Sequence, residues 1–157
     1  TELYDLYAGN GALGLACSDV VERIVSVESM PDNITRRKEI ALENNATNIE
    51  FINDKVENYL TAIVQSQMSI TSDAVVVLDP PRAGLHPKAL QHLLTLEPPY
   101  LIYISCKPEV LAKQDLPPLL TKYRILDREA VDMFPHTPHV ELALLLKSKS
   151  ADHEMPV

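Results

Sequence analysis

The chain has few cysteines and no pair of cysteines or histidines that comes with partners for a metal. Cys17 and Cys106 are its two cysteines, and they provide no disulfide framework of the kind that holds small secreted domains together. His136 and His139 have a spacing close to that of zinc ligands but lack partner ligands. We therefore expect neither a disulfide scaffold nor a metal centre.

Long apolar runs are also missing. None approaches the roughly 20 residues that a helix needs to cross a bilayer, and no secretory leader is visible where the chain opens at Thr1. These absences argue against a membrane protein and favour an intracellular, cytoplasmic setting.

Positive charge is scarce. The 157 residues carry 14 Lys and Arg against 22 Asp and Glu, a net charge of −8. Because phosphate binding depends on Lys and Arg, we do not expect this domain to grip nucleic acid strongly by itself. Arg36, Arg37 and Lys38 are the one basic cluster in the sequence. The chain opens without methionine and almost directly on a strand, so we expect a fragment whose further basic surface lies elsewhere.

Short β-rich runs alternate with helical stretches along the whole length, which fits one α/β domain with a mostly parallel sheet. The expected strands are 2–6, 23–28, 49–52, 74–78, 100–105, 123–133 and 140–147, the last two as an antiparallel pair. The expected helices are 13–22, 31–46, 55–66, 86–96 and 108–121, with Pro117 and Pro118 shortening or bending the last one. Residues 148–157 are expected to form a flexible tail.

A glycine loop follows the first strand. It reads Asp5-Leu-Tyr7-Ala-Gly9-Asn-Gly11-Ala-Leu-Gly14, and Glu28 ends the next strand. Glycines let the backbone approach a ligand, and a carboxylate at that strand end can accept hydrogen bonds from ribose hydroxyls. Nicotinamide-binding and adenosylmethionine-binding folds share this pattern, and a tight turn without a ligand would also explain it.

Two acidic residues favour the adenosylmethionine interpretation. The carboxylate of Asp5 would receive an ammonium group but would repel a pyrophosphate. Asp54 follows the third strand, where an acceptor for an adenine amino group is expected. A nicotinamide-dependent oxidoreductase remains an alternative at this point.

Three further segments carry chemistry. Asp79-Pro80-Pro81-Arg82 follows the most apolar strand, at the sheet edge where open α/β folds bind ligands. Cys106 ends another strand just before a helix, where backbone N–H groups favour a negative charge. Glu141 enters the last apolar strand as a candidate base. A rigid turn at Asp79, an inert thiol and a solvated carboxylate are the structural alternatives.

Together these segments resemble the RNA uridine-C5 methyltransferases, the 5-methyluridine family that acts on tRNA and 23S rRNA. Four segments match in order: 5–14, 78–84, 103–108 and 133–141. The resemblance implies a Rossmann-like class I methyltransferase fold with a seven-stranded sheet, and S-adenosylmethionine as methyl donor. Lys107 departs from the asparagine usual in the family, and Ala12 from the asparagine of some members.

The resemblance also implies site residues. Cys106 would be the nucleophile and Glu141 the base. The expected cofactor-binding residues are Asp5, Tyr7, Gly9, Gly11, Glu28, Asp54 and Asp79, and Arg82 is expected to contact base or substrate.

Residues 1–147 would form the catalytic domain, and an N-terminal RNA-binding part would be absent. A cofactor-binding module without turnover stays open as an alternative. An amine or cytosine methyltransferase is disfavoured, because Arg82 stands where those enzymes usually have an aromatic residue or a cysteine.

Overall fold

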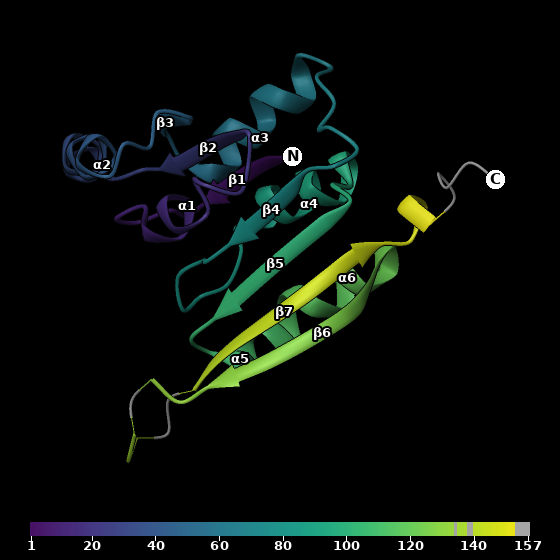
Figure 1. Cartoon of the computed structure of the whole chain (residues 1–157). Helices are drawn as coiled ribbons and strands as arrows, with labels where there is room; N and C mark the ends of the chain where they lie inside the picture. Colours follow the sequence, from purple (N-terminus) through teal and green to yellow (C-terminus); the bar gives the residue numbers. More distant parts are fainter. Residues whose placement is uncertain (134, 138–139, 153–157) are drawn as a thin grey trace.

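Seven strands form one sheet in the order β3-β2-β1-β4-β5-β7-β6 (Figure 1). The computed structural model describes residues 1–133, 135–137 and 140–152, without the side chains of residues 32, 33 and 152. The strands are β1 (Glu2–Leu6), β2 (Arg23–Glu28), β3 (Ile49–Asn53), β4 (Val75–Leu78), β5 (Tyr100–Ser105), β6 (Tyr123–Val131) and β7 (Glu141–Ser148). The first five run parallel, and β7 is antiparallel to both β5 and β6. The expected α/β class and antiparallel C-terminal hairpin are confirmed.

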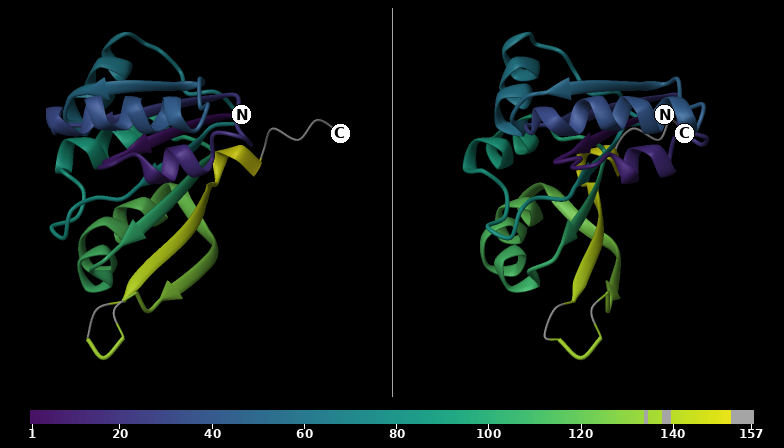
Figure 2. Two further views of the ribbon diagram at one scale, coloured as in Figure 1. Left: turned by 60° about the vertical axis from the view of Figure 1, so that its left-hand side comes forward. Right: turned by 90° about the vertical axis from the view of Figure 1, so that its left-hand side faces the viewer.

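Helices cover both faces of this sheet (Figure 2). They are α1 (Ala12–Ala16), α2 (Pro31–Glu43), α3 (Val56–Gln65), α4 (Pro87–Leu96), α5 (Pro108–Val110), the π-helical turn η1 (Leu111–Asp115), α6 (Leu116–Lys122) and the 3₁₀ turn η2 (Ser150–Asp152). In the part of the chain that the structure describes, none of these helices is long and apolar enough to cross a membrane.

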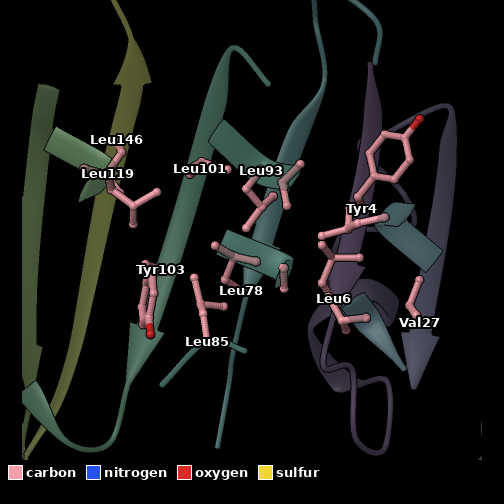
Figure 3. Close-up of a cluster of buried hydrophobic side chains, with 14 of the residues drawn as sticks. Tyr4, Leu6, Val27, Leu78, Leu85, Leu93, Leu101, Tyr103, Leu119 and Leu146 are labelled. Carbon is pink, nitrogen blue, oxygen red and sulfur yellow. The ribbon is translucent and has the colours of Figure 1, made fainter. Parts of the chain in front are cut away.

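The main core lies on one face, where α3, α4 and α6 pack on the sheet (Figure 3). Leu6, Leu78, Leu101 and Leu146 come from four neighbouring strands and are fully buried there. A smaller cluster around Leu3, Ile24 and Val77 lies on the opposite face. Burying a leucine side chain is worth about 1.5–3 kcal/mol, so the main core fixes the central strands and hence the loops that follow them.

The helix expected over 13–22 is much shorter in the structure and ends at Ala16. The N–H of Cys17 turns back to the carbonyl of Gly14, and the hydroxyl of Ser18 donates to the carbonyl of Leu15. A serine hydroxyl that competes for a backbone carbonyl favours turns over helix. The last strand extends one residue past the expected end, to a fully buried Ser148. Residues 153–157 of the expected tail lie outside the described residues.

The helical stretch after β5 does not break at its prolines. It passes from α5 through η1 into α6, whose first turn contains Pro117 and Pro118. Proline lacks the N–H that an α-helix interior needs and its ring collides with a carbonyl one turn earlier. The wider π turn ahead of the prolines relieves both conflicts, since it changes the hydrogen-bond register over Leu111–Asp115.

Candidate active site

Five parallel strands end at the same edge of the sheet, where two adjacent cavities lie, the second lined in part by the C-terminal hairpin. The first cavity has a volume of about 840 Å³, within the range of about 300–1,000 Å³ typical of small-molecule sites. The second cavity has a volume of about 450 Å³. Asp79, which follows β4, lines both cavities and therefore stands at their junction.

The first cavity contains four of the seven residues expected to bind a cofactor. Tyr7, Gly9, Glu28 and Asp79 line it. One carboxylate oxygen of Glu28 accepts the N–H of Gly9 at 2.9 Å and the other accepts the N–H of Met30 at 2.8 Å. Glu28 thus links the glycine loop to the segment after β2. Tyr7 holds a left-handed backbone angle of φ 63°, a strained conformation of the kind that gathers at ligand sites.

Asp5 does not lie in this cavity, which differs from the expectation that it receives an ammonium group there. Its side chain is fully buried beneath the loop, and its Oδ2 accepts the N–H of Gly14 at 3.0 Å. The cause is strand alternation, which turns Asp5 to the same face as Leu3, where α1 covers the sheet. Burial raises the pKa of Asp5 to about 6.

Asp54 and Gly11 also lie outside the two cavities. The Oδ1 of Asp54 accepts the N–H of Lys55 and the side-chain amide of Asn58, so this carboxylate organises the start of α3. Gly11 has φ +79°, and a Cβ there would lie 2.9 Å from the Cδ of Arg37. The glycine therefore makes room for the buried arginine that supports the loop.

Sequence reasoning missed several residues of the first cavity. Lys55, Val56 and Glu57 line it at the start of α3, together with Ala83, Gly84, Leu85, His86 and Gln114. The expected residue Asp54, which follows β3, directly precedes these lining residues of α3 in the chain. Gln114 gave no signal, because its place depends on the π turn of η1.

The second cavity brings Cys106 and Glu141 together. Both line it, Cys106 from the end of β5 and Glu141 from the start of β7, which runs antiparallel beside it. Both side chains are half-buried rather than sealed in the core. The other lining residues are apolar apart from Asp79: Leu13, Ile104, Val131, Met133 and Ala143.

Charge couples the two cavities. The pKa of Asp79 is raised, first by desolvation and then by the negative charge of Glu141. Two carboxylates thus face the region between the cavities, where a cation would be attracted. Arg82 is exposed in the loop after Asp79 and lines neither cavity, although its neighbours Pro81 and Ala83 line the first.

Only two residues of the basic cluster at 36–38 are exposed, Arg36 and Lys38, because the central one is buried. Arg37 is 2% exposed, donates to the hydroxyl of Ser26 at 2.9 Å and lies over the ring of Phe51. Burial lowers the pKa of Arg37.

Among the described residues no group of three or more His, Cys, Asp or Glu side chains could hold a metal ion, and His139 lies outside those residues.

A doubly wound sheet with an antiparallel C-terminal hairpin and ligand cavities at its carboxyl edge defines the class of S-adenosylmethionine-dependent methyltransferases. The chain belongs to the tRNA (uracil-5-)-methyltransferase family, whose model matches residues 1–149. The resemblance found in the sequence and the fold that it implied are thereby confirmed.

Relatives support this membership. An RNA methyltransferase of Caldanaerobacter subterraneus is 37% identical over 146 residues, and another from Listeria monocytogenes is 38% identical over 147; these cover 92% and 94% of this chain. The chain spans about a third of the length of these relatives, 31% in each case.

Solved structures agree. The tRNA (uracil-54, C5)-methyltransferase of Pyrococcus abyssi, in complex with S-adenosyl-L-homocysteine, superposes with a TM-score of 0.77 at 33% identity, over 92% of this chain and 33% of that one. An rRNA methylase of Streptococcus thermophilus shares the fold. It superposes with a TM-score of 0.64 at 12% identity, over 94% of this chain and 86% of that one.

Proposed function

We propose that this domain binds S-adenosylmethionine in the first cavity and transfers its methyl group to C5 of a uridine in RNA through a covalent adduct on Cys106. The observation that carries the proposal is the pair of adjoining cavities, with Cys106 and Glu141 in one and the glycine loop in the other. Residues 1–147 form the catalytic domain. A part of the protein outside this chain provides most of the binding to tRNA or rRNA.

The residues of the first cavity suit this donor. Glu28 stands at the end of β2, where its carboxylate can accept ribose hydroxyls. Glu57 and Asp79 add negative charge around a cationic ligand. Gly9 leaves open space, since a Cβ there would meet no atom within 4 Å. When bound, the sulfonium of the donor supplies an electrophilic methyl group, which the junction at Asp79 would turn toward the second cavity.

The residues of the second cavity suit covalent catalysis on a pyrimidine. C5 of uracil is too weak a nucleophile to take a methyl group unaided. The thiolate of Cys106 adds to C6, so that electrons move to C5 and O4, and C5 forms its bond to the methyl carbon as the carbon–sulfur bond of the donor breaks. Glu141 then removes the C5 proton, and the bond between Cys106 and C6 breaks as the ring double bond forms again.

The complete gene product that carries these residues tests the proposal. Cys106→Ala should lower the rate of methyl transfer to uridine-containing tRNA or rRNA transcripts by at least about 10³-fold. Without the nucleophile, the other catalytic residues cannot accelerate the reaction. Affinity for S-adenosylhomocysteine, measured by calorimetry, should stay unchanged. Cys17→Ala is the matched control, since this half-buried thiol packs against the smaller core cluster, and its transfer rate should stay normal.

A second variant tests the base. Glu141→Gln should slow proton removal after methyl transfer and so accumulate a protein–RNA adduct that survives denaturing electrophoresis. Normal turnover by Cys106→Ala would contradict the assignment of the nucleophile. Donor binding without transfer by the unaltered protein would instead favour a binding module without turnover.

A further inference from the structure

The proposed reaction leaves one buried carboxylate unused. Asp115 is 2% exposed and ends the π turn η1. Its neighbours on the same side of the helical stretch, Leu111 and Leu119, lie in the main core. Burying a carboxylate in such surroundings costs free energy unless hydrogen-bond donors surround it. The hydrogen bonds of Asp115 therefore show which elements it holds in place.

Asp115 joins a strand to a loop. Its Oδ2 accepts the hydroxyl of Tyr103 on β5 at 2.5 Å and the backbone N–H of Leu85 at 2.9 Å. Tyr103 and Leu85 both lie near the carboxyl ends of the central strands (Figure 3). Their burial leaves little room for water to replace the carboxylate.

Gly84 allows this contact. It has φ +86°, and a Cβ at that position would lie 2.7 Å from the Oδ2 of Asp115. Its N–H closes a turn onto the carbonyl of Pro81 at 2.8 Å. The backbone of the loop therefore bends directly onto the carboxylate, and no larger residue would fit between them.

The joined elements belong to the two cavities. The loop begins at Asp79, which lines both, and ends with Gly84 and Leu85, which line the first. Tyr103 lies on β5, three residues before Cys106, which directly follows that strand. Gln114, next to Asp115, lines the first cavity. A shift of Asp115 would thus move the wall of the first cavity relative to the thiol in the second.

We propose that Asp115 is a positioning residue that, with Tyr103, clamps the loop 79–85 onto β5 and so sets the donor cavity in line with Cys106. The inference rests on the proposed function for the identity of the ligand. The clamp itself acts through the loop and touches neither the donor nor the reacting atoms.

Two matched tyrosines allow a clean test. Tyr103→Phe removes one hydroxyl from the clamp. Tyr123→Phe removes a hydroxyl from an equally buried tyrosine that donates to the carbonyl of Pro98, away from both cavities. Both variants lose one buried hydrogen bond, but Tyr103→Phe loses a bond to a carboxylate and Tyr123→Phe a bond to a neutral carbonyl, so thermal unfolding should shift more in Tyr103→Phe. Faster exchange confined to the loop 79–85 and weaker ligand affinity in Tyr103→Phe alone therefore report the position of its hydroxyl, because Tyr123→Phe controls for the loss of a buried hydrogen bond elsewhere.

Two readouts are measured on the purified chain: hydrogen exchange of the backbone amides at 82–85, and affinity for S-adenosylhomocysteine by calorimetry. Tyr103→Phe should speed loop exchange and weaken affinity by about 3–10-fold, since only part of the free energy of the lost hydrogen bond to the carboxylate affects ligand binding. Asp115→Ala should speed loop exchange and weaken affinity more than Tyr103→Phe does. Asp115→Asn, which keeps an oxygen acceptor, should restore part of the loss.

Each outcome decides the matter. Equal effects of Tyr103→Phe and Tyr123→Phe, or loop exchange unchanged in Asp115→Ala, would overturn the clamp. Faster loop exchange with unchanged affinity would overturn its link to the donor cavity. If the unaltered chain binds no S-adenosylhomocysteine, the proposed function fails, and the exchange rates alone then decide whether Asp115 fixes the loop.

Discussion

Glu28 is the residue that ties the first cavity together. Its two carboxylate oxygens accept backbone N–H groups from Gly9, in the loop after β1, and from Met30, in the segment after β2. Hydrogen bonds to an ionised acceptor are about twice as strong as neutral ones. One charged side chain therefore shapes the loop and still faces the cavity, where the proposed ribose would lie.

Glu28→Gln should expose this double role. The amide offers one oxygen, so one of the two backbone N–H groups would face an NH₂ group. We expect affinity for S-adenosylhomocysteine to fall by about 10–100-fold, from the roughly 1.5–3 kcal/mol of a charged hydrogen bond. Calorimetry measures the affinity. Glu43→Gln, on the exposed end of α2, is the control. Equal affinities of the two variants would remove Glu28 from the proposed site.

The buried carboxyl group of Asp5 should make the free energy of unfolding depend on pH. Burial raises its pKa to about 6 from the ordinary value of 3.8, so the unfolded chain releases this proton at lower pH than the folded one. The folded state therefore loses stability as the pH rises from about 4 to about 6, by on the order of 3 kcal/mol.

Asp5→Asn should remove this loss, because the amide oxygen can still accept the N–H of Gly14. The variant should gain stability relative to the unaltered chain as the pH rises through that window, measured by urea unfolding and circular dichroism. A constant difference in the free energy of unfolding from pH 4 to pH 7 would contradict the role given to Asp5.

At the scale of elements, the C-terminal hairpin carries half of the second cavity. β7 brings Glu141 beside β5, and β6 contributes Val131 at its end. β6 pairs with β7 alone, and eight of its nine residues are exposed. Apart from Tyr123 at the start of β6, which is buried in the main core, the anchoring of the hairpin therefore comes from β7, whose leucines enter that core.

A cross-strand pair tests this anchoring. Leu146 on β7 is fully buried, and Ile125 stands opposite it on β6 at 40% exposure. Leu146→Ala should lower the free energy of unfolding by about 2–5 kcal/mol, and Ile125→Ala by less than about 1.5 kcal/mol, because less apolar surface is lost. Urea denaturation distinguishes them, and similar losses would show that both strands anchor the hairpin.

For the whole molecule, most elements could be predicted because hydrophobic periodicity is a local property. Tyr100–Ser105 was predicted to the residue, and the antiparallel end of the sheet was expected from its two long strands. The strand order and the π turn depend on tertiary packing and gave no local signal.

The site shows the same division. Cys106, Glu141 and Asp79 line the second cavity; their places at strand ends made them candidates, and the resemblance to the family gave Cys106 and Glu141 their expected roles. Asp5 lies buried beneath the glycine loop and Asp54 lies outside the two cavities, because a sequence shows which loop a carboxylate belongs to but not which way its side chain turns. Asp115 gave no sign of its place, since a carboxylate within a helical stretch normally faces solvent.

A crystal structure of this chain with S-adenosylhomocysteine tests the central claim most directly. The account predicts the ribose at Glu28 in the first cavity, and the sulfur at the junction beside Asp79, facing the thiol of Cys106 across the second cavity. A ligand bound elsewhere, or a sulfur turned away from Cys106, would contradict it.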